Sequence, residues 1–326
     1  MEIIFFGTSS GIPTKSRNVS GLALKRKNAK SWYLVDCGEG TQQQILHTRL
    51  SLLKLQAILI THMHGDHCYG LPGLLASAAM AGRSRALTVI GPAAIKDFVT
   101  YSLNITNSRL SYEITFIAVE NLKNDFELAD FKLEVVPLSH RVPCFAYAFL
   151  EKYSPSQLDV DKLKAAGIKP GPIWGHLQKG LDTLYEGQIL KAHDYQLAPK
   201  KRRKIIIAGD NDKPELLAEC AKSAEALIHE ATYSSDVAAK LGGAYQHSHA
   251  KSVAQFAARV GLQNLVLTHF SPRYSDKTSA TPSIKTIELE AKSVYQGNLF
   301  LARDLDTYYL NHDGVLNCVP IYRHVK

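Results

Sequence analysis

The sequence has few of the features that mark membrane proteins or disulfide-stabilised proteins. Apolar runs never reach the roughly 20 residues that a membrane helix requires, because Arg, Lys, Asp or His interrupts each of them. The N-terminal stretch MEIIFFGTSSGIP lacks the basic region of a signal peptide. The five cysteines are scattered without any CxxC pair, which indicates free thiols in a reducing compartment. We therefore expect a cytoplasmic protein without a membrane segment.

The charge balance is moderately basic. Lys and Arg number 38 against 30 Asp and Glu, which gives a formal net charge of +8 over 326 residues. Such an excess favours an anionic partner such as nucleic acid, although a charge that serves solubility alone explains it equally well. A hydrophobic fraction of 45% is that of an ordinary folded protein with a large core.

Short β-type runs alternate with helix-like segments along most of the chain. The runs are EIIFFG, SWYLVDCG, LQAILIT, LTVIG, EITFIAV, FKLEVVPL, FAYAFL, KIIIAGD, NLVLTH and NLFLA. The helix-like segments are 41–50, 70–81, 214–223, 248–260 and 282–292. This mixture predicts a layered α/β protein, and the chain shows no internal repeat. We expect a single domain over residues 1–326.

The clear strand-like runs stop between Glu151 and Pro199. A polar, lysine-bearing stretch takes over, and KPGPIWGHLQKG places a turn between two weak helical patterns. We interpret residues 151–199 as a flexible arm inserted into the domain. The basic run KKRRK at 200–204 follows and leads into the strand IIIAGD. We expect that run to be the solvated start of the strand.

The densest group of ligand-type side chains is THMHGDHCYG, which follows the apolar run LQAILI. His62 and His64 stand two residues apart, so an extended backbone would point both the same way. Asp66 and His67 follow Gly65, which lets the chain turn sharply. Imidazole and carboxylate groups are the natural ligands of zinc in hydrolytic sites. Because two ligand pairs exceed what one tetrahedral ion needs, the cluster predicts a dinuclear site.

Further ligand candidates stand at the ends of separate apolar strands. His140 ends VVPLSH, Asp210 ends IIIAGD, and His269 ends LVLTH. Side chains at the carboxyl ends of strands converge on one rim of a sheet, where α/β proteins commonly place their active sites. We therefore expect these residues to join the HxHxDH cluster.

HxHxDH followed by distant His, Asp and His residues resembles the metallo-β-lactamase superfamily. The resemblance implies a four-layer αββα sandwich that binds two zinc ions per subunit, with manganese as an alternative metal. The implied ligands are His62, His64 and His140 for one ion, Asp66, His67 and His269 for the other, and Asp210 as a bridge. Asp36 in LVDCGEG matches the superfamily's early structural aspartate. The motif leaves the substrate open, because superfamily members hydrolyse lactams, thioesters, lactones and phosphodiesters.

Other stretches resemble the ribonuclease Z family, whose members trim tRNA 3′ trailers. PTKSRN resembles the family's PxKxRN loop, GDHCYGLPGLL continues its metal motif, and GPIWG resembles the tip of its tRNA-binding arm. HEAT, HSHA and HFSPRY resemble the family's HEAT, HST and HFSxRY signatures in the same order. The resemblance covers residues 1 to about 274, nearly the whole catalytic core.

This resemblance implies a set of substrate-binding residues. They are Lys15, Arg17, Asn18, Gly171, Pro172, Gly175, Ser271 and Arg273. Paired cations in the PTKSRN loop suit phosphates, but charge alone explains them equally well as an exposed basic loop. The arm carries lysines beside a flat tryptophan, which suits an RNA backbone, and its alternative is a dimerisation loop.

The resemblance also assigns the proton transfers. Asp66 would bind metal and accept a proton from the attacking water. His247 would protonate the departing 3′ oxygen, with Glu230 holding its imidazole and raising its pKa. His229 is expected to pack inside the fold, because alternate strand residues face opposite ways.

Two positions depart from the family pattern. Asn211 follows Asp210 where threonine is usual, and His249 stands where HST has its threonine. Neither removes a predicted ligand, so we expect activity to survive. His249 leaves open which of two neighbouring histidines, itself or His247, handles a proton.

Together these features predict a zinc-dependent endoribonuclease that removes the 3′ trailer from tRNA precursors. It would leave a 3′-hydroxyl on the tRNA and a 5′-phosphate on the trailer. The family implies a homodimer in which one subunit's arm presents tRNA to the other's site. Another hydrolase on this fold, arylsulfatase-like, cyclic-nucleotide-cleaving or lactone-cleaving, would explain the metal residues but not the arm or PTKSRN. A non-catalytic RNA-binding or scaffold protein conflicts with the complete ligand set.

Overall fold

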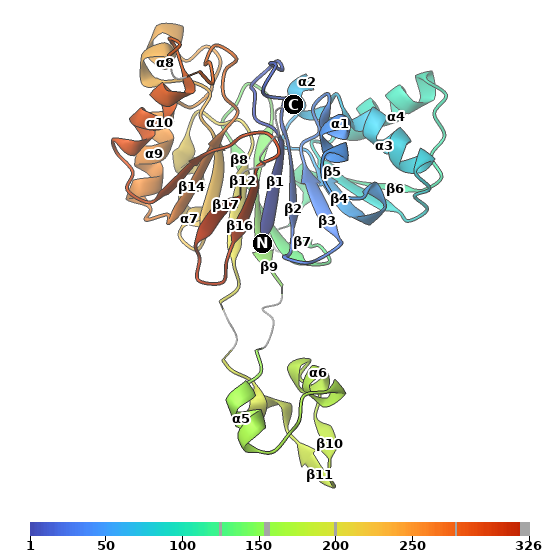
Figure 1. The fold of residues 1–326 in the computed structure, drawn as a ribbon. Coiled ribbons are helices and arrows are strands. Elements are labelled where there is room, and N and C mark those ends of the chain that lie inside the picture. Colours follow the sequence, from blue (N-terminus) through green and yellow to red (C-terminus); the bar gives the residue numbers. More distant parts are fainter. Residues whose placement is uncertain (124–125, 153–156, 199–200, 278, 320–326) are drawn as a thin grey trace. The chain divides into compact units, whose positions relative to one another are not determined.

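The computed structural model describes residues 1–123, 126–152, 157–198, 201–277 and 279–319. The chain divides into two compact units. The core unit comprises Met1–Leu150 and Lys204–Lys326, and the arm comprises Glu151–Arg203 (Figure 1). Of the predicted arm, residues 153–156 and 199 lie outside the described residues, as does residue 200 of the basic run.

The first sheet of the core unit has eight strands in the order β17-β16-β1-β2-β3-β4-β5-β6. Their bounds are β1 Glu2–Gly7, β2 Gly21–Lys25, β3 Trp32–Val35, β4 Leu55–Leu59, β5 Leu87–Gly91, β6 Ile114–Ala118, β16 Thr307–Leu310 and β17 Leu316–Val319. From β3 to β6 the neighbours pair in parallel. β3, β4 and β5 are almost wholly buried, which is typical of parallel strands covered on both faces.

The second sheet has seven strands in the order β15-β14-β13-β12-β9-β8-β7. Their bounds are β7 Phe126–Glu127, β8 Phe131–Leu138, β9 Cys144–Glu151, β12 Lys204–Ala208, β13 Ala226–Glu230, β14 Asn264–Thr268 and β15 Asn298–Leu301. β12 to β15 pair in parallel, whereas β9 is antiparallel to β12. The parallel strands therefore present their carboxyl ends at one edge of the sheet.

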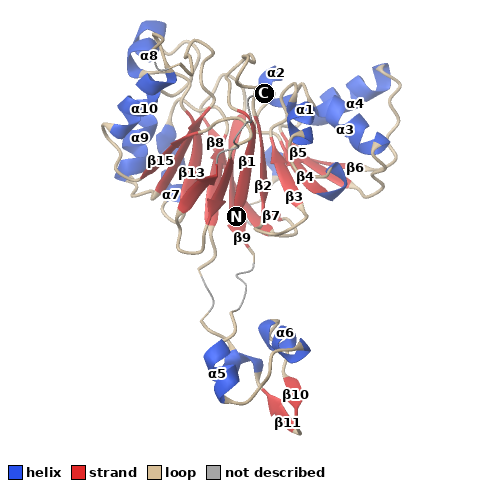
Figure 2. Cartoon of the chain, in the orientation of Figure 1, coloured by secondary structure: helices blue, strands red, loops and turns tan. Residues whose placement is uncertain are grey.

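Helices cover the outer faces of both sheets (Figure 2). Their bounds are α1 Thr41–Leu46, α2 Gly65–Cys68, α3 Leu71–Met80, α4 Ala94–Ile105, α7 Ala218–Ala221, α8 Ser235–Leu241, α9 Ala250–Arg259 and α10 Ile284–Lys292, with short 3₁₀ turns η1 Leu52–Lys54, η2 Val119–Asn121 and η4 Pro214–Leu217. One apolar cluster lies between the sheets, a second between the first sheet and α1, α3 and α4, and a third between the second sheet and α7, α9 and α10. The predicted four-layer αββα sandwich is confirmed.

The arm has a small core of its own. Its elements are α5 Val160–Ala165, α6 Pro172–Gln178, β10 Thr183–Tyr185, β11 Gln188–Leu190 and the 3₁₀ turn η3 Ala192–Tyr195. Leu163, Ile168 and Leu177 are buried together in it. The arm has two helices, but α6 lies within the stretch KPGPIWGHLQKG where a turn was expected, and the β10–β11 hairpin was not predicted. Its two-residue turn has positive φ at Glu186 and Gly187, and glutamate at the first of these positions is not the usual Asn-Gly or Asp-Gly signal.

Several predicted elements differ from those observed. The segment 41–50 forms a helix only as far as Leu46, and 214–223 splits into η4 and α7. Strands β2, β13, β16 and β17 were not among the predicted runs. Helix α4 was also missed, although Ile95 and Val99 have helical spacing and are buried.

The basic run at 200–204 is only partly solvated. Arg203 and Lys204 are 5% and 6% exposed, so the expectation of a solvated strand start is wrong for both. Arg203 Nε donates to Glu151 Oε2 at 2.8 Å, and Lys204 Nζ donates to Glu134 Oε2 at 2.6 Å. Buried cations of this kind need an ionic partner, and carboxylates from other strands supply it.

The predicted free thiols are confirmed, since Cys37, Cys68, Cys144, Cys220 and Cys318 form no disulfide. Among the helices of the described residues, none has the length and apolar character needed to span a bilayer.

Candidate metal centre

The predicted metal ligands lie just beyond the ends of strands on one edge of the sandwich. Asp210 follows β12 by two residues, and His269 directly follows β14. Strands β12 and β14 both pair in parallel with β13, which lies between them, so their carboxyl ends lie at the same edge of the sheet. His62 comes from the segment after β4, and His140 from the segment after β8. The fold thus gathers residues that are far apart in the sequence.

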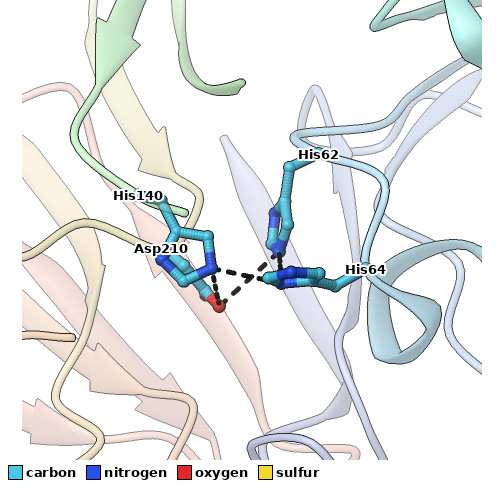
Figure 3. A group of neighbouring side chains, drawn as sticks. All are labelled: His62, His64, His140 and Asp210. Carbon is cyan, nitrogen blue, oxygen red and sulfur yellow. Dashed lines mark hydrogen bonds and ion pairs between the residues drawn. The ribbon is translucent and has the colours of Figure 1, made fainter. Parts of the chain in front are cut away.

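One group of facing atoms comprises His62, His64, His140 and Asp210 (Figure 3). His64 Nδ1 lies 3.1 Å from His62 Nε2 and 3.1 Å from His140 Nε2. Asp210 Oδ2 lies 3.6 Å from His62 Nε2 and 3.7 Å from His140 Nε2. The four ligand atoms thus surround a common point.

A second group comprises Asp66, His67 and His269. Asp66 Oδ2 lies 3.6 Å from His67 Nε2 and 3.3 Å from His269 Nε2, and the two imidazole nitrogens are 3.2 Å apart. Asp210 Oδ1 faces this group, at 3.6 Å from His67 Nε2 and 3.5 Å from His269 Nε2. Asp210 therefore directs one oxygen at each group, which is the arrangement of a bridging carboxylate.

These distances fit tetrahedral zinc. Bonds of about 2.0–2.1 Å place ligand atoms of a tetrahedron about 3.3 Å apart, and the observed separations are close to that value. His140 Nδ1 donates to the Gln246 carbonyl at 2.9 Å, so its Nε2 carries a lone pair. That lone pair points at His64 Nδ1, and two nitrogen lone pairs that face each other repel. A cation between the nitrogens removes the repulsion, so the donor set suits a metal ion.

Asp36 orients two of the ligand imidazoles. His67 Nδ1 donates to Asp36 Oδ2 at 2.7 Å, which leaves its Nε2 free to bind metal. Thr61 Oγ1 donates to the same carboxylate at 2.9 Å and lies 3.0 Å from His62 Nδ1. Because a hydroxyl has one proton, Thr61 accepts from His62 and thereby sets its tautomer. Asp36 has a φ of 58°, a left-handed conformation that is rare for a residue other than glycine.

Thr232 performs the same role for His269. Its Oγ1 donates to Glu230 Oε2 at 2.6 Å and lies 3.0 Å from His269 Nδ1. The single hydroxyl proton is therefore used on the carboxylate, and the imidazole Nδ1–H donates to the hydroxyl. The sequence reasoning missed both threonines. Their positions in the sequence could have identified them, since Thr61 precedes a predicted ligand and Thr232 ends the HEAT motif.

Burial keeps the first group of imidazoles neutral. It lowers the pKa of His62 well below its usual value, and the neighbouring imidazoles lower it further. Burial also lowers the pKa of His64 and of His140. Neutral imidazole is the form that binds metal, so these side chains are ready for it without losing a proton.

The second group is rich in negative charge. Burial lowers the pKa of His67, but the carboxylates of Asp66, Asp210 and Asp36 outweigh it and raise that pKa to about 10. Burial raises the pKa of Asp66, yet His67 and His269 outweigh this and hold it well below its usual range. The Gly11 amide, which donates to Asp66 Oδ2 at 2.7 Å, acts in the same direction. Buried carboxylates gathered in this way attract a cation.

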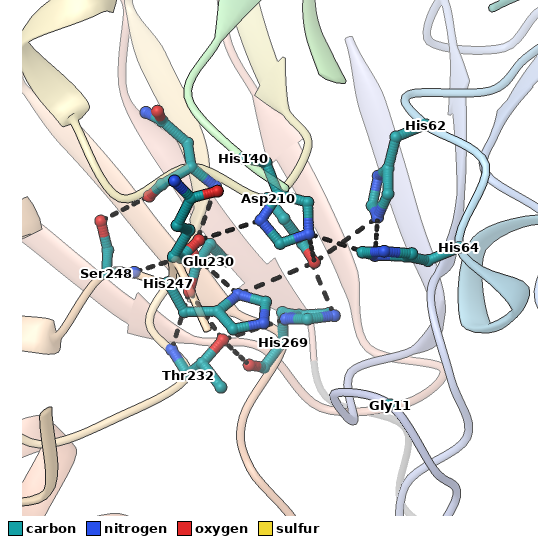
Figure 4. Close-up of polar contacts among 12 residues, drawn as sticks. Gly11, His62, His64, His140, Asp210, Glu230, Thr232, His247, Ser248 and His269 are labelled. Atoms are coloured by element: carbon teal, nitrogen blue, oxygen red, sulfur yellow. Dashed lines mark hydrogen bonds and ion pairs between the residues drawn. The ribbon is translucent and has the colours of Figure 1, made fainter. Parts of the chain in front are cut away.

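Glu230 holds His247 beside the ligands (Figure 4). Its Oε1 lies 3.2 Å from His247 Nδ1 and accepts from the Ser248 amide at 2.8 Å. Burial raises the pKa of Glu230, but the nearby histidines outweigh it and hold that pKa well below its usual value. Burial likewise lowers the pKa of His247, and the charge of Glu230 outweighs it and raises that pKa to about 9.

The neighbouring histidines have structural contacts. His229 is fully buried, with Nε2 3.1 Å from Asn211 Nδ2 and Nδ1 2.7 Å from the Glu230 carbonyl. His249 caps α9, because its Nδ1 accepts from the Ser252 amide at 3.2 Å. His249 is therefore engaged in capping, which leaves His247 as the histidine that faces Asp210.

Two glycines leave room for side chains beside the centre. A Cβ on Gly209 would lie 2.6 Å from Cys144 Sγ and 2.7 Å from Thr61 Cβ. A Cβ on Gly65 would lie 2.1 Å from Tyr69 Cε2. Gly65 begins α2 and is not among the residues with positive φ. Its observed role is therefore to make room for the Tyr69 ring, rather than the sharp turn that we expected.

The PTKSRN loop uses its arginine internally. Arg17 is 5% exposed, and its guanidinium donates to Thr8 Oγ1 at 2.7 Å, to the Ala302 carbonyl at 2.8 Å and to Asp276 Oδ1 at 2.7 Å. This placement differs from the expected phosphate contact, because the charge is already paired. Asn18 donates its amide to Asp304 Oδ2 at 2.6 Å.

Lys15 is exposed on the same loop. It lines a polar pocket together with Asn18 and helix α1 residues, separate from the cleft at the metal ligands. Ser271 is buried and accepts from Arg273 Nε at 3.0 Å, while the Arg273 guanidinium lies 5.3 Å above the Tyr233 ring. Neither Ser271 nor Arg273 is among the residues that line the cleft.

The remaining predicted substrate residues belong to the arm. Gly171 and Pro172 are exposed, and Gly175 is half-buried in α6. A Cβ on Gly171 or Gly175 would meet no atom within 4 Å, so neither glycine is required by packing inside the arm. Trp174 is half-buried against the arm core, and its Nε1 donates to the Ile168 carbonyl at 3.2 Å.

An open cleft of about 290 Å³ gives access to the metal ligands. It is lined by Ser10, Gly11, Glu39, His64, Gly65, Asp66, Tyr69, Arg141, Asp210, His247 and His269. Glu39, Tyr69 and Arg141 were not predicted from the sequence as site residues. Tyr69 and Arg141 each stand within two residues of a predicted ligand, and that proximity was the available signal.

The chain is similar over nearly its full length to known proteins. A Ribonuclease Z of Marinobacter nauticus is 51% identical over 322 residues, covering 98% of this chain and 99% of the relative. A Ribonuclease Z of Pseudomonas putida strain W619 is 49% identical over 319 residues, covering 98% of this chain and 99% of the relative. The solved structure of human tRNase Z, short form, has a TM-score of 0.62 and 25% identity, covering 95% of this chain and 100% of that chain.

A family model described as Anti-Pycsar protein Apyc1 matches residues 1–153. That match covers less than half of the chain and stops where the arm begins, whereas the similarity to the ribonucleases Z extends over nearly the whole chain.

Proposed function

The chain belongs to the ribonuclease Z family, and from this premise we propose how its site acts. It is a hydrolytic endoribonuclease of tRNA 3′ processing, related over nearly its full length to proteins of that name. We assign it the removal of the 3′ trailer, which leaves a 3′-hydroxyl on the tRNA and a 5′-phosphate on the trailer. The observation that carries this assignment is the pair of ligand groups that share Asp210 at an open cleft.

The cofactor is two zinc ions per subunit, and manganese is an alternative because imidazole and carboxylate ligands accept both. His62, His64 and His140 would hold one ion, Asp66, His67 and His269 would hold the other, and Asp210 would serve both. Bound zinc would supply Lewis-acid stabilisation of charge on the phosphate and lower the pKa of the attacking water. The observed ligand separations and the relays through Asp36, Thr61 and Thr232 support this set.

Side chains at the cleft perform the proton transfers. Asp66 is fixed by the Gly11 amide and accepts a proton from the attacking water. His247 donates a proton to the departing 3′ oxygen, because an alkoxide is a poor leaving group. Glu230 keeps the imidazole charged and oriented through the contact at 3.2 Å. The polar partners that hold Glu230, including the Thr232 hydroxyl and the Ser248 amide, support its role as an ionised anchor.

A substitution tests the role of His247. The His247→Ala variant is expected to keep its zinc and lose about 10²- to 10⁴-fold in cleavage, the usual value of general-acid assistance. Zinc is measured by elemental analysis and cleavage by single-turnover kinetics on a precursor tRNA. His249→Ala is the matched control, since His249 caps a helix and should leave the chemical step unchanged. Equal rates for His247→Ala and the unaltered protein would remove His247 from the mechanism.

The arm binds the tRNA away from the cut. Lys169, His176 and Lys179 are exposed and stand near the half-buried Trp174 in the sequence, and the arm's own core supports these residues as an independent unit. Gly171 is the N-cap of α6, and Pro172 and Gly175 belong to that helix, where small residues let an RNA strand approach closely. Deleting residues 169–179 is expected to reduce kcat/KM on precursor tRNA and to spare a small phosphodiester, because remote binding energy is lost.

The PTKSRN loop contributes in two ways. Exposed Lys15 contacts a phosphate, and Asn18 shapes the adjoining polar pocket. Arg17 acts through the loop's conformation, because its guanidinium is bound to Asp276. Arg273 provides charge near the RNA, with Ser271 fixing its Nε.

The proposed activity is tested by mapping products. Purified protein is expected to cut a 3′-extended tRNA precursor endonucleolytically, to lose the activity with a chelator, and to regain it with zinc. The value of kcat/KM for the precursor should exceed that for a small phosphodiester by orders of magnitude. Retained cleavage in excess chelator, or preference for the small substrate, would contradict the proposal.

We propose that the protein works as a homodimer in the cytoplasm. Leu46 on α1 and Met80 on α3 are 78% and 81% exposed, and apolar surface of this kind suits contact with a second copy. The free thiols agree with a reducing compartment. Met80→Asp is expected to shift native mass from dimer toward monomer, whereas an unchanged mass would exclude this surface as the interface.

A further inference from the structure

The cleft at the metal centre contains one arginine, Arg141, among its lining residues. The other cations proposed for RNA lie elsewhere: Lys15 lines a separate pocket, and Arg17 is buried against Asp276. Arg273 is engaged with Ser271 and does not line the cleft. Of these cations, Arg141 is the one that lines the cleft at the predicted ligands.

Arg141 is free to bind an anion. It is exposed and forms no ion pair with any residue of the described part of the chain. Its guanidinium lies 5.8 Å from the centre of the Tyr245 ring, which supports the planar group from one side. Since Arg141 directly follows His140, its backbone is held by a ligand whose Nδ1 donates to the Gln246 carbonyl. A supported planar guanidinium suits bidentate binding of a phosphate.

Tyr69 supplies an aromatic surface in the same cleft. Its side chain is 63% exposed although the ring is held in place. The ring occupies the space where a Cβ on Gly65 would lie, at 2.1 Å from Tyr69 Cε2, and Phe98 lies 6.3 Å away at an interplanar angle of 32°. The ring is thus fixed next to Asp66 while much of it remains open to solvent. RNA-binding proteins stack unpaired bases on rings of this kind.

Charge at the cleft explains the need for Arg141. When metal ions are bound, they compensate the charge of the scissile phosphate. The phosphates on either side of the cut keep their own charge, and the cleft wall presents the exposed carboxylate of Glu39 to them. Without Arg141, the cleft would carry no permanently charged cation from the chain itself.

We propose that Arg141 and Tyr69 bind the nucleotide next to the scissile phosphate, the guanidinium through its phosphate and the phenol ring by stacking on its base. This inference rests on the proposed function, because it presumes a single-stranded RNA end in the cleft. The nucleotide belongs either to the first position of the trailer or to the last position of the tRNA. Both present the same chemistry, and the substrates described below distinguish them.

Protein variants give the first test. Arg141→Ala is expected to lower kcat/KM on precursor tRNA by about 10- to 100-fold, the usual loss of a hydrogen bond between charged groups. Arg141→Lys should recover only part of this, because it lacks the planar fork. Tyr69→Ala should lose about 5- to 100-fold, whereas Tyr69→Phe keeps the ring and should stay within about twofold. Arg259→Ala is the matched control, since this exposed arginine pairs with Glu215 on the outer helical layer.

Modified substrates give the second test. A neutral methylphosphonate replaces the phosphate on one or the other side of the scissile linkage, and an abasic residue replaces the base at either flanking position. The loss caused by Arg141→Ala should vanish with one of the two methylphosphonates, and that caused by Tyr69→Ala with one of the two abasic substrates. The position at which each loss vanishes identifies the bound nucleotide. Losses that persist on all modified substrates would overturn the proposal, as would activity of Arg141→Ala and Tyr69→Ala within about twofold of the unaltered protein.

The unaltered protein separates this inference from the proposed function. If it does not cleave the unmodified precursor, the proposed function has failed. If it cleaves the precursor but is indifferent to both methylphosphonates and both abasic positions, only the role of Arg141 and Tyr69 has failed. Zinc content and thermal unfolding of each variant are measured alongside, so that a folding defect is recognised and the substrate series decides.

Discussion

Replacing Thr232 with valine tests the relay that orients His269. Valine has nearly the same shape, so the change removes the hydroxyl and leaves packing almost intact. Glu230 loses the donor at 2.6 Å, and the His269 Nδ1–H loses its acceptor at 3.0 Å. A hydrogen bond to a charged group and a buried unsatisfied N–H together correspond to about 2–4 kcal/mol of unfolding free energy. Loss of an orienting contact also weakens metal binding by about 10- to 100-fold.

Two measurements check these values. Urea unfolding of the chelator-treated protein gives the change in unfolding free energy, and zinc titration against a competing chelator gives the affinity. Thr88→Val on β5 is the matched control, because Thr88 has no side-chain hydrogen bond to a described residue; its effect should be within about 0.5 kcal/mol. Thr232→Ser keeps the hydroxyl and should bind zinc almost normally. If Thr232→Val resembled Thr88→Val in both measurements, the hydroxyl relay would not orient His269.

Three further substitutions test the carboxylate of Asp210, the packing around Gly209 and the ion pair between Glu151 and Arg203. Asp210→Ala is expected to lose bound metal and cleavage together, as measured by elemental analysis and precursor processing; full occupancy would exclude a bridging role. Gly209→Ala should cost about 1–3 kcal/mol in unfolding free energy, because its Cβ would overlap atoms already present, and an unchanged melting curve would contradict this. Burial raises the pKa of Glu151, but Arg203 outweighs it and holds that pKa below the ordinary 4.5. The pair therefore stabilises the fold above about pH 4.5 and ceases to do so as the pH falls through the lowered pKa. Glu151→Gln should flatten the acid dependence of stability measured by unfolding at several pH values, and an unaltered dependence would show that the pair is unimportant.

Much of the metal centre follows from local patterns. HxHxDH places four ligand-type side chains within six residues, so no knowledge of tertiary contacts is needed to recognise them. His140, Asp210 and His269 were predicted from their positions behind apolar runs, since strand ends converge in layered α/β folds. The β-runs and the inserted segment likewise predicted a layered α/β protein and the arm, because apolar periodicity and breaks in it are properties of the local sequence; the four-layer sandwich was implied by the family resemblance.

Residue type by itself did not reveal what each polar side chain contacts. Arg17 looks like a phosphate ligand in the sequence, yet it is neutralised by Asp276, which lies 259 residues away. Tyr69 and Arg141 carry no motif of their own and become relevant only because the fold opens a cleft beside them.

The chain's own sequence thus predicted the cluster of candidate metal ligands and the layered architecture, because both depend on short patterns. Tertiary structure decided which charges are buried, which tautomers the imidazoles adopt and which side chains line the cleft. Those properties depend on pairs such as Asp36 with His67 and Thr232 with His269, whose members come from separate strands. Their contacts exist only once the neighbouring strands, β3 with β4 and β13 with β14, have paired.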